Sequence, residues 1–198
     1  MTSDRMTTEF LAYVAVALGE EAVDVSATGV DLTPDGPRVR YVGVPTSMRP
    51  TDRQHLRRDR ALAVEACSRL VAIRWRRPPA PLVPPQDSYL RLADAYPDVY
   101  TSPTETSAGW HALLVMAAEW MREYGPPQGF VAQQVKSKFG TLRFYYSDDS
   151  DDPRATAAAG IIEAVERISR GVCEVCGAPA KLRTRGGWYE TVCDEHVR

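Results

Sequence analysis

The stretch "CEVCGAPAKLRTRGGWYETVCDEH", residues 173–196, decides how the last part of the chain folds. Three cysteines and one histidine stand in it as two pairs separated by 16 residues: Cys173-x2-Cys176 and Cys193-x2-His196. Two intervening residues let both members of a pair reach one ion, and the long gap lets the chain return with the second pair. Gly177 follows the first pair, where such a turn favours a positive φ. The pattern predicts a closed Cys3His site for one structural Zn2+ ion.

Other uses of these cysteines fit the sequence less well. A redox CxxC motif needs a βαβ context and would leave Cys193 and His196 without a role. A zinc deaminase needs H-x-E ahead of P-C-x-x-C, whereas a Gly-Val dipeptide precedes the first pair here. A catalytic zinc ion usually keeps an open position beside three protein ligands, and four ligands leave none open. The sequence therefore favours a metal ion that stabilises the fold.

Length and composition limit the possible classes of protein. The 198 residues, 44% of them hydrophobic, suffice for one sizeable core or two small ones. No apolar run approaches the roughly 18–20 residues that cross a bilayer, so we expect no membrane association. A formal net charge of −2 excludes an overall polycation, so nucleic acid would have to bind a local basic patch. Cysteines in a metal-ligand pattern indicate a reducing compartment, and we expect a cytoplasmic protein.

A proline-rich stretch, residues 78–87, marks the clearest break in the chain. Its five prolines cannot donate backbone hydrogen bonds, and each restricts the residue before it. We expect either an extended linker or a stiff packed connection. The predicted domains are an N-terminal unit of unknown role, residues 1–77, and a zinc-binding α+β domain, residues 88–198.

The N-terminal unit is predicted to fold as α-β-β-α. A helix is expected around Thr8–Gly19, and residues 23–44 alternate in polarity around a TPDG turn, as a β-hairpin does. A second long helix follows, because five apolar residues are spaced for one helical face: Leu56, Ala63, Cys67, Leu70 and Ile73.

The second unit is predicted to be a helix–β-hairpin–helix unit that ends in a Cys3His zinc knuckle or ribbon. One helix is expected near Ser107–Tyr124, and another with an apolar face ends at Gly171. Between them, alternation on both sides of Gly140 predicts a hairpin that turns at Phe139–Thr141. Its apolar face is expected to contain Val131, Val135, Phe139, Leu142, Phe144 and Tyr146. The fold class predicted for the whole chain is α+β.

Three blocks of sequence resemble a family of bacterial and bacteriophage proteins with no assigned activity. They are "GW" at Gly109–Trp110, "QVKSKFGTLRFYY" at Gln134–Tyr146 and "CEVCGAP…GWYETVCDEH" at Cys173–His196. The resemblance covers about residues 105–198 and implies an architecture and a phage or mobile-element origin, but no reaction. The family often has Glu where Ser137 stands, which weakens any charged role at that position. Residues 1–85 show no such resemblance.

A basic helix is the first candidate surface for a partner. The segment Arg49–Arg77 holds nine arginines, and three of them are spaced to share one helical face: Arg53, Arg57 and Arg60. Each guanidinium group in such a row could donate two hydrogen bonds to one phosphate. The alternative, which we favour, is a solvated helix face that is partly paired with the acidic segment before it.

The second predicted hairpin is the other candidate surface. Its polar face is expected to carry Lys136, Lys138 and Arg143, together with Gln134 and Tyr145. Basic groups interleaved with an aromatic ring can bind nucleic acid, although any hairpin with one face on helices exposes such residues. Three basic residues of the predicted zinc loop could extend this surface: Lys181, Arg183 and Arg185. We expect Trp188 and Tyr189 to pack over the metal site.

The sequence nominates no catalytic residue. It contains no G-x-S-x-G, P-loop or G-x-G-x-x-G motif, and no nucleophile with a matching base. We therefore expect a non-enzymatic, zinc-stabilised protein that binds a macromolecule, and the net charge of −2 favours a protein partner over DNA. The first alternative is a nucleic-acid-binding regulator that uses the arginine helix and the basic hairpin face. The second is an enzyme whose site forms only in the fold.

Overall fold

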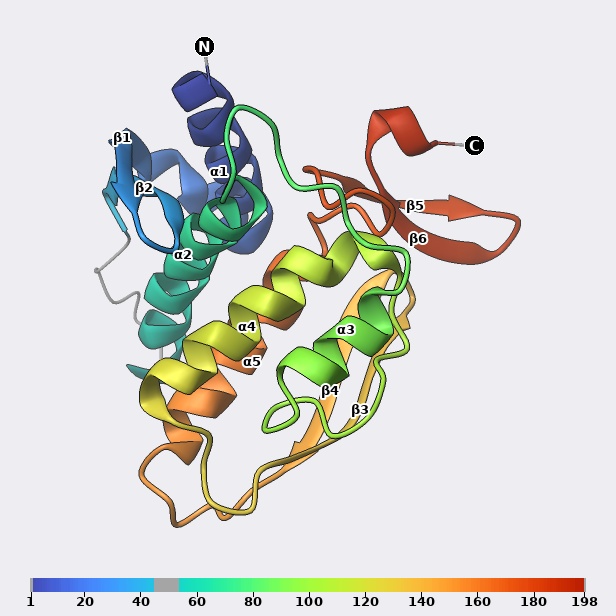
Figure 1. Cartoon of the computed structure of the whole chain (residues 1–198). Helices are drawn as coiled ribbons and strands as arrows, with labels where there is room; N and C mark the ends of the chain where they lie inside the picture. The colour runs from blue at the N-terminus through green and yellow to red at the C-terminus, as the bar shows by residue number, and fades with distance from the viewer. Residues whose placement is uncertain (1, 45–53, 198) are drawn as a thin grey trace.

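The computed structural model describes residues 2–44 and 54–197 and has a mixed α+β architecture (Figure 1), as predicted. Four helices pack on one another in the middle of the molecule: α1 (Thr2–Leu18), α2 (Gln54–Arg74), α4 (His111–Tyr124) and α5 (Ala155–Ser169). The shorter α3 (Ser88–Ala95), which the sequence pattern did not reveal, lies beside α4. In the described ranges, none of the helices combines the length and apolarity that a membrane crossing requires.

Two β-hairpins flank these helices on opposite sides (Figure 1), and a third projects from the molecule. The strands are β1 (Ser26–Thr33), β2 (Gly36–Val42), β3 (Val131–Lys138), β4 (Thr141–Ser147), β5 (Lys181–Arg185) and β6 (Trp188–Val192). Each sheet has two antiparallel strands. The β1–β2 hairpin packs on α1 and α2, and β4 packs on α5.

Helical periodicity explains the central layer. Of the apolar stripe predicted for the second long helix, the four members whose side chains the structure describes are buried in α2: Ala63, Cys67, Leu70 and Ile73. The side chain of Leu56 lies outside the described residues. α1 likewise buries Phe10, Tyr13 and Val14 at helical spacing. The hydrophobic side chains on these faces leave water together, which provides the main driving force for packing the helices.

The β3–β4 hairpin turns where the sequence predicts, but its apolar face differs from the predicted one. Lys138 pairs with Thr141 across the turn. A β-bulge shifts the register between Ala132 and Gln134, and this extra residue reverses the alternation of side chains. Ala132 is consequently buried, while Val131 is 41% exposed. Phe139 lies in the turn itself and is 67% exposed, so the prediction was wrong for both residues.

Both outer edges of the β3–β4 hairpin have hydrogen-bond partners. On β4, the backbone N–H of Leu142 donates to Ser169 Oγ and that of Phe144 donates to Glu166 Oε1, at 3.0 and 2.7 Å. On β3, the backbone N–H and the carbonyl oxygen of Glu105 form hydrogen bonds with the two β3 residues on either side of Lys136. Because these edges are occupied, the polar face and the turn are the parts of this hairpin that remain open to a partner.

Residues from both predicted domains contribute to one hydrophobic core. Phe10 and Leu70 from the first segment belong to the same buried cluster as Trp110, Leu114 and Ile162 from the second. The stretch 78–87 crosses from the end of α2 to the start of α3 (Figure 1). The boundary at 78–87 stays a prediction, but the shared core favours the packed connection over the flexible linker.

Candidate metal centre and the surface beside it

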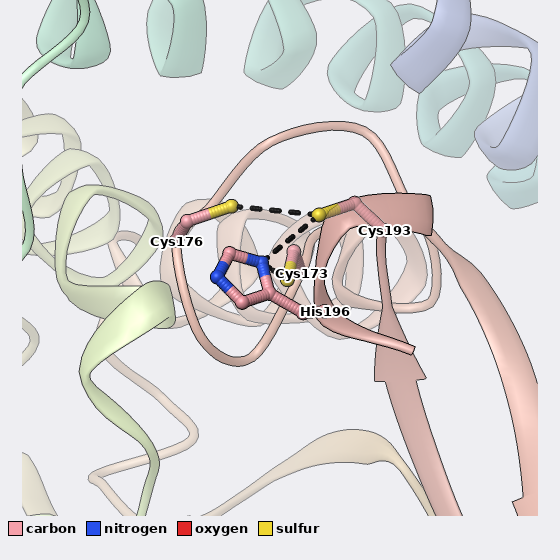
Figure 2. Close-up of side chains that lie close together, drawn as sticks. All are labelled: Cys173, Cys176, Cys193 and His196. Atoms are coloured by element: carbon pink, nitrogen blue, oxygen red, sulfur yellow. Dashed lines mark hydrogen bonds between the residues drawn. The ribbon is translucent and has the colours of Figure 1, made fainter. Parts of the chain in front are cut away.

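The four predicted ligands converge on one point (Figure 2). Sγ of Cys176 lies 3.7 Å from Sγ of Cys193. Nδ1 of His196 lies 3.1 Å from Sγ of Cys193 and 3.7 Å from Sγ of Cys173. All four ligand atoms are within 4.8 Å of one another. This arrangement could hold one metal ion.

Local backbone geometry brings each ligand to the site. Cys173 and Cys176 lie in a turn that continues to Gly177, whose φ is +76°, and the predicted positive φ is therefore confirmed. An added Cβ at Gly177 would lie 2.4 Å from Arg74 Nη1, so a larger residue does not fit there. Cys193 directly follows β6, and a short 3-10 helix, Asp194–His196, carries the histidine back to the cysteines.

The electrostatics of the cluster also favour a bound cation. Burial raises the pKa of the Cys176 thiol to about 12, and the neighbouring Cys173 sulfur adds to this effect. Burial opposes ionisation of Cys173 as well, but hydrogen bonds from backbone N–H groups hold its pKa below the usual value. Thiols this close oppose one another's ionisation, and a coordinated metal ion removes that opposition because it binds the thiolate form.

The N-terminal helices reach the metal centre through a buried polar network that the sequence did not reveal. Arg74 Nη1 donates to the carbonyl oxygen of Cys176 at 2.8 Å, and the Tyr13 hydroxyl donates to that of Gly177 at 2.6 Å. Glu9 Oε1 accepts from Arg74 Nε at 2.5 Å and lies 3.1 Å from the Tyr13 hydroxyl oxygen. The side chains of Arg74 and Glu9 are only 3% and 9% exposed. The 173–177 turn is thus held by α1 and α2.

The "GW" block contacts the same turn from a short 3-10 helix, Ala108–Trp110, which leads into α4. The backbone N–H of Gly109 donates to the carbonyl oxygen of Glu174 at 2.8 Å. A Cβ at Gly109 would lie 2.2 Å from the carbonyl oxygen of Cys173, so only glycine allows this approach. The indole N–H of the buried Trp110 donates to the carbonyl oxygen of Val172 at 2.9 Å. These contacts give a structural reason for both the glycine and the tryptophan of the block.

Glu174 joins the β3–β4 hairpin to the metal centre. Its carboxylate accepts from Ser137 Oγ at 3.0 Å and from the backbone N–H of Thr191 at 2.9 Å. Burial raises the pKa of Glu174. Thr191 Oγ1 in turn donates to the carbonyl oxygen of Gly140 at 2.6 Å. Ser137 therefore contributes a hydrogen bond to this connection.

The three blocks that carry the family resemblance thus meet at the metal centre. No protein-family model, curated protein or solved structure matches the chain. The resemblance accordingly rests on those blocks alone, and their mutual contacts give each of them a structural role.

The predicted arginine row is only partly described, and its one described side chain is not solvent-facing. Arg53 lies outside the described residues, and Arg57 lies in α2 with its side chain outside them. Arg60 is 9% exposed, and its Nε lies 2.7 Å from Glu21 Oε2. The expected exposed face was wrong at Arg60, because that side of α2 faces the acidic segment that follows α1. Pairing with that segment is the alternative that the sequence favoured.

The basic hairpin residues do lie together. The β3–β4 register sets Lys136 opposite Arg143, so these side chains and that of Lys138 are on the same face. Lys136 Nζ lies 5.6 Å from the ring centre of Tyr145, and Lys138 Nζ lies 5.7 Å from that of Phe139. Each ammonium group therefore has an aromatic ring beside it.

Trp188 does not pack over the metal site, contrary to expectation. Residues 181–192 form the β5–β6 hairpin, which projects from the body (Figure 1), and Trp188 is next to its turn. Trp188 is 81% exposed and Tyr189 is 48% exposed. The ring of Tyr189 meets that of Phe139 edge-on at 5.9 Å. The predicted zinc loop is therefore a β-hairpin over most of its length.

Two cavities bear on the enzyme alternative. One, of about 730 Å³, lies against Cys176 and Cys193, between α1 and the stretch 78–87. The other, of about 410 Å³, is lined in part by His111, whose Nδ1 lies 2.9 Å from Ser88 Oγ. Burial lowers the pKa of His111. Ser88 is only 1% exposed, so this pair does not present a nucleophile to the cavity. In the first cavity, Sγ of Cys193 lies 3.1 Å from His196 Nδ1, but both residues are predicted ligands of the metal ion.

Proposed function

We propose that the protein is non-enzymatic, that one zinc ion stabilises its fold, and that it acts by binding a macromolecular partner. Sulfur atoms about 2.3 Å from a tetrahedral zinc ion lie about 3.8 Å apart, and the Sγ atoms of Cys176 and Cys193 are 3.7 Å apart. Four protein ligands leave no coordination position for water or substrate. The 173–177 turn would then be a zinc knuckle, and β5–β6 the ribbon beside it.

We expect one zinc ion per chain in protein produced in medium of defined metal content. The Cys176→Ala variant should lose the ion, because three ligands remain where four are needed. The Cys67→Ala variant is the matched control: Cys67 is buried in the core away from the cluster and should leave the metal content unchanged. Elemental analysis measures both. A metal-free folded protein, or freely reactive thiols at Cys173, Cys176 and Cys193, would contradict the assignment.

A group of exposed rings beside the metal centre is the observation that supports partner binding. We define the hairpin surface as the exposed aromatic residues and lysines on the second and third hairpins: Phe139, Tyr145, Trp188, Tyr189, Lys136, Lys138 and Lys181. Single exposed apolar residues are common, but neighbouring ones mark interaction sites. The contact between Phe139 and Tyr189 joins the two hairpins. Trp188 and Lys181 lie on the other face of β5–β6 from Tyr189, because side chains alternate along a strand and the register sets Lys181 opposite Val192 and Trp188 opposite Arg185.

The net charge of −2 supports a protein partner, and the pairing of Arg60 with Glu21 weakens the arginine helix as a nucleic-acid site. The lysines of the hairpin surface support the nucleic-acid alternative instead. We propose a cytoplasmic location because thiolate ligands persist in reducing compartments. The resemblance supports an origin in a phage or mobile element.

Affinity purification from the organism of origin, with and without nuclease, should recover a partner through the hairpin surface. Replacing Phe139 and Trp188 together by serine should abolish recovery, because the two most exposed rings of the surface are lost. The Leu32→Ser variant is the control, since Leu32 is 85% exposed on the β1–β2 hairpin. Equal recovery by all three proteins, or recovery by none of them, would contradict the proposed binding function.

A further inference from the structure

The lysines of this chain have an uneven distribution. Only three of the 24 basic residues are lysines, and all three lie on β3 or β5: Lys136, Lys138 and Lys181. The described ion pairs all use arginine, and within residues 2–44 and 54–197 no lysine pairs with a carboxylate. Most of the described arginines on and beside the helices therefore have a carboxylate partner, whereas the three lysines of the hairpin surface have none in the described part of the chain.

Arg143 strengthens this contrast. It lies opposite Lys136 in the hairpin, and its described hydrogen bond goes to the backbone oxygen of Leu142 rather than to a carboxylate. Two acidic residues of this region do not pair with Arg143. Glu105 accepts a hydrogen bond from Gln134 at 2.8 Å, and Glu190 lies on β6 opposite Arg183. Cations without carboxylate partners on an otherwise acidic protein form a local site for an anion.

Exposed rings stand beside these cations. Phe139 and Lys138 form one ring–cation pair, and Tyr145 and Lys136 form another. Single-stranded nucleic acid has the matching pattern, because each nucleotide offers a flat base for a ring and a phosphate for a cation. A duplex hides its base faces within the stack, so rings at hairpin tips cannot reach them. An acidic peptide would satisfy the cations but has no reason to require flat rings.

The backbone of Phe139 gives an independent indication. Its φ is +54°, in the left-handed region that residues with a Cβ rarely adopt. Asparagine or glycine would suit this turn position better, and burial does not explain the phenylalanine, whose side chain is 67% exposed. A strained, exposed aromatic residue is the kind of backbone outlier from which a binding role can be inferred.

We propose that the hairpin surface binds single-stranded nucleic acid. Bases stack on Phe139 and Tyr145 beside Lys138 and Lys136, and the strand passes around the tip of the β5–β6 hairpin to reach Trp188 and Lys181 on its other face. This inference rests on the proposed binding function and names its partner. Repulsion from the acidic remainder of the molecule confines the contact to this surface. The binding is therefore weak, tolerant of sequence and strongly dependent on salt.

Tryptophan fluorescence provides a direct readout of stacking. Of the four tryptophans, Trp75, Trp110 and Trp120 are at most 2% exposed, whereas Trp188 is 81% exposed. Titration with an unlabelled oligothymidylate of about 12 nucleotides, a length within the range of known single-strand sites, should quench the emission of Trp188. Anisotropy of the same oligonucleotide with a fluorescent label gives the affinity and its salt dependence.

The variants separate stacking from charge. Phe139→Asn should relieve backbone strain, and so keep or raise stability, while it weakens binding about fivefold to a hundredfold, as loss of one stacked base does. Replacing the three lysines by glutamine should lower the salt slope by about 2, at about 0.7 for each contact with a single strand. Leu32→Ser and Arg40→Gln, on the β1–β2 hairpin, are the matched controls and should change neither quantity.

Three results would overturn the inference. They are no binding of the oligonucleotide at low salt, equal binding by the wild type and Phe139→Asn, and equally tight binding of polyglutamate or of a duplex of the same length. In another outcome the oligonucleotide does not bind, while the purification still recovers a protein whose recovery resists nuclease and is lost when Phe139 and Trp188 are replaced. In that case the proposed binding function stands and this partner is wrong. If both experiments fail, the binding function is wrong as well.

Discussion

Removal of the metal ion is expected to unfold the molecule as a whole. The binding free energy of structural zinc is about 10–16 kcal/mol in small zinc peptides, which equals or exceeds the about 5–15 kcal/mol that stabilises a typical domain. The 173–177 turn accepts hydrogen bonds from Tyr13, Arg74 and Gly109. Losing the ion therefore disturbs α1, α2 and α4 together, and not only the residues near the C-terminus.

The Cys193→Ala variant and the chelated wild type should both lack the native circular-dichroism spectrum and the cooperative thermal transition of the metal-bound wild type. Limited proteolysis should leave no stable fragment. Asp194→Ala is the matched control, because the Asp194 side chain adjoins Cys193 yet is 92% exposed, and an exposed ion pair contributes little. Release of a stable fragment ending near residue 77 would show instead that the predicted N-terminal domain folds independently.

Local sequence spacing accounts for the parts of the structure that could be predicted. Cys173 and Cys176 must lie together because two residues separate them, and a CxxH pair behaves in the same way. Helical periodicity reports which residues of α2 are buried, since every member of the stripe faces the same neighbours. The turn at Gly140 follows from alternation on both sides of it. Each inference needs only residues that are close in the chain.

Features that depend on one extra residue or on distant residues could not be predicted. The bulge before Gln134 changes which side chains of β3 are buried, and a single inserted residue leaves no periodic trace. Glu9 and Arg74 are 65 residues apart. A hint existed, because Glu9 lies within the buried stripe of α1 between Met6 and Phe10. A charged residue in an apolar stripe needs a buried partner, but the sequence does not say which one.

The Glu9–Arg74 pair yields the second large effect. Arg74→Met should destabilise the protein by about 3–5 kcal/mol, because it leaves the Glu9 carboxylate buried without its partner. The double variant Glu9→Met/Arg74→Met removes both charges and should be destabilised much less than the sum of the two single changes. Chemical denaturation measures these differences. Arg91→Met provides the baseline, since the Arg91–Asp87 pair is exposed and an exposed ion pair contributes little to stability.

Metal affinity separates the two roles of Arg74. The double variant regains stability, but the carbonyl oxygen of Cys176 still lacks the donor that positions it. Losing a group that orients a metal ligand typically costs about 10–100-fold in metal affinity, so competition with a chelator should show weaker binding in both Arg74 variants. If the double variant recovers metal affinity together with stability, Arg74 acts only through Glu9. If Arg74→Met costs no more than Arg91→Met, the pair does not stabilise the fold. Both measurements together therefore decide whether α1 and α2 only pack beside the metal centre or help to build it.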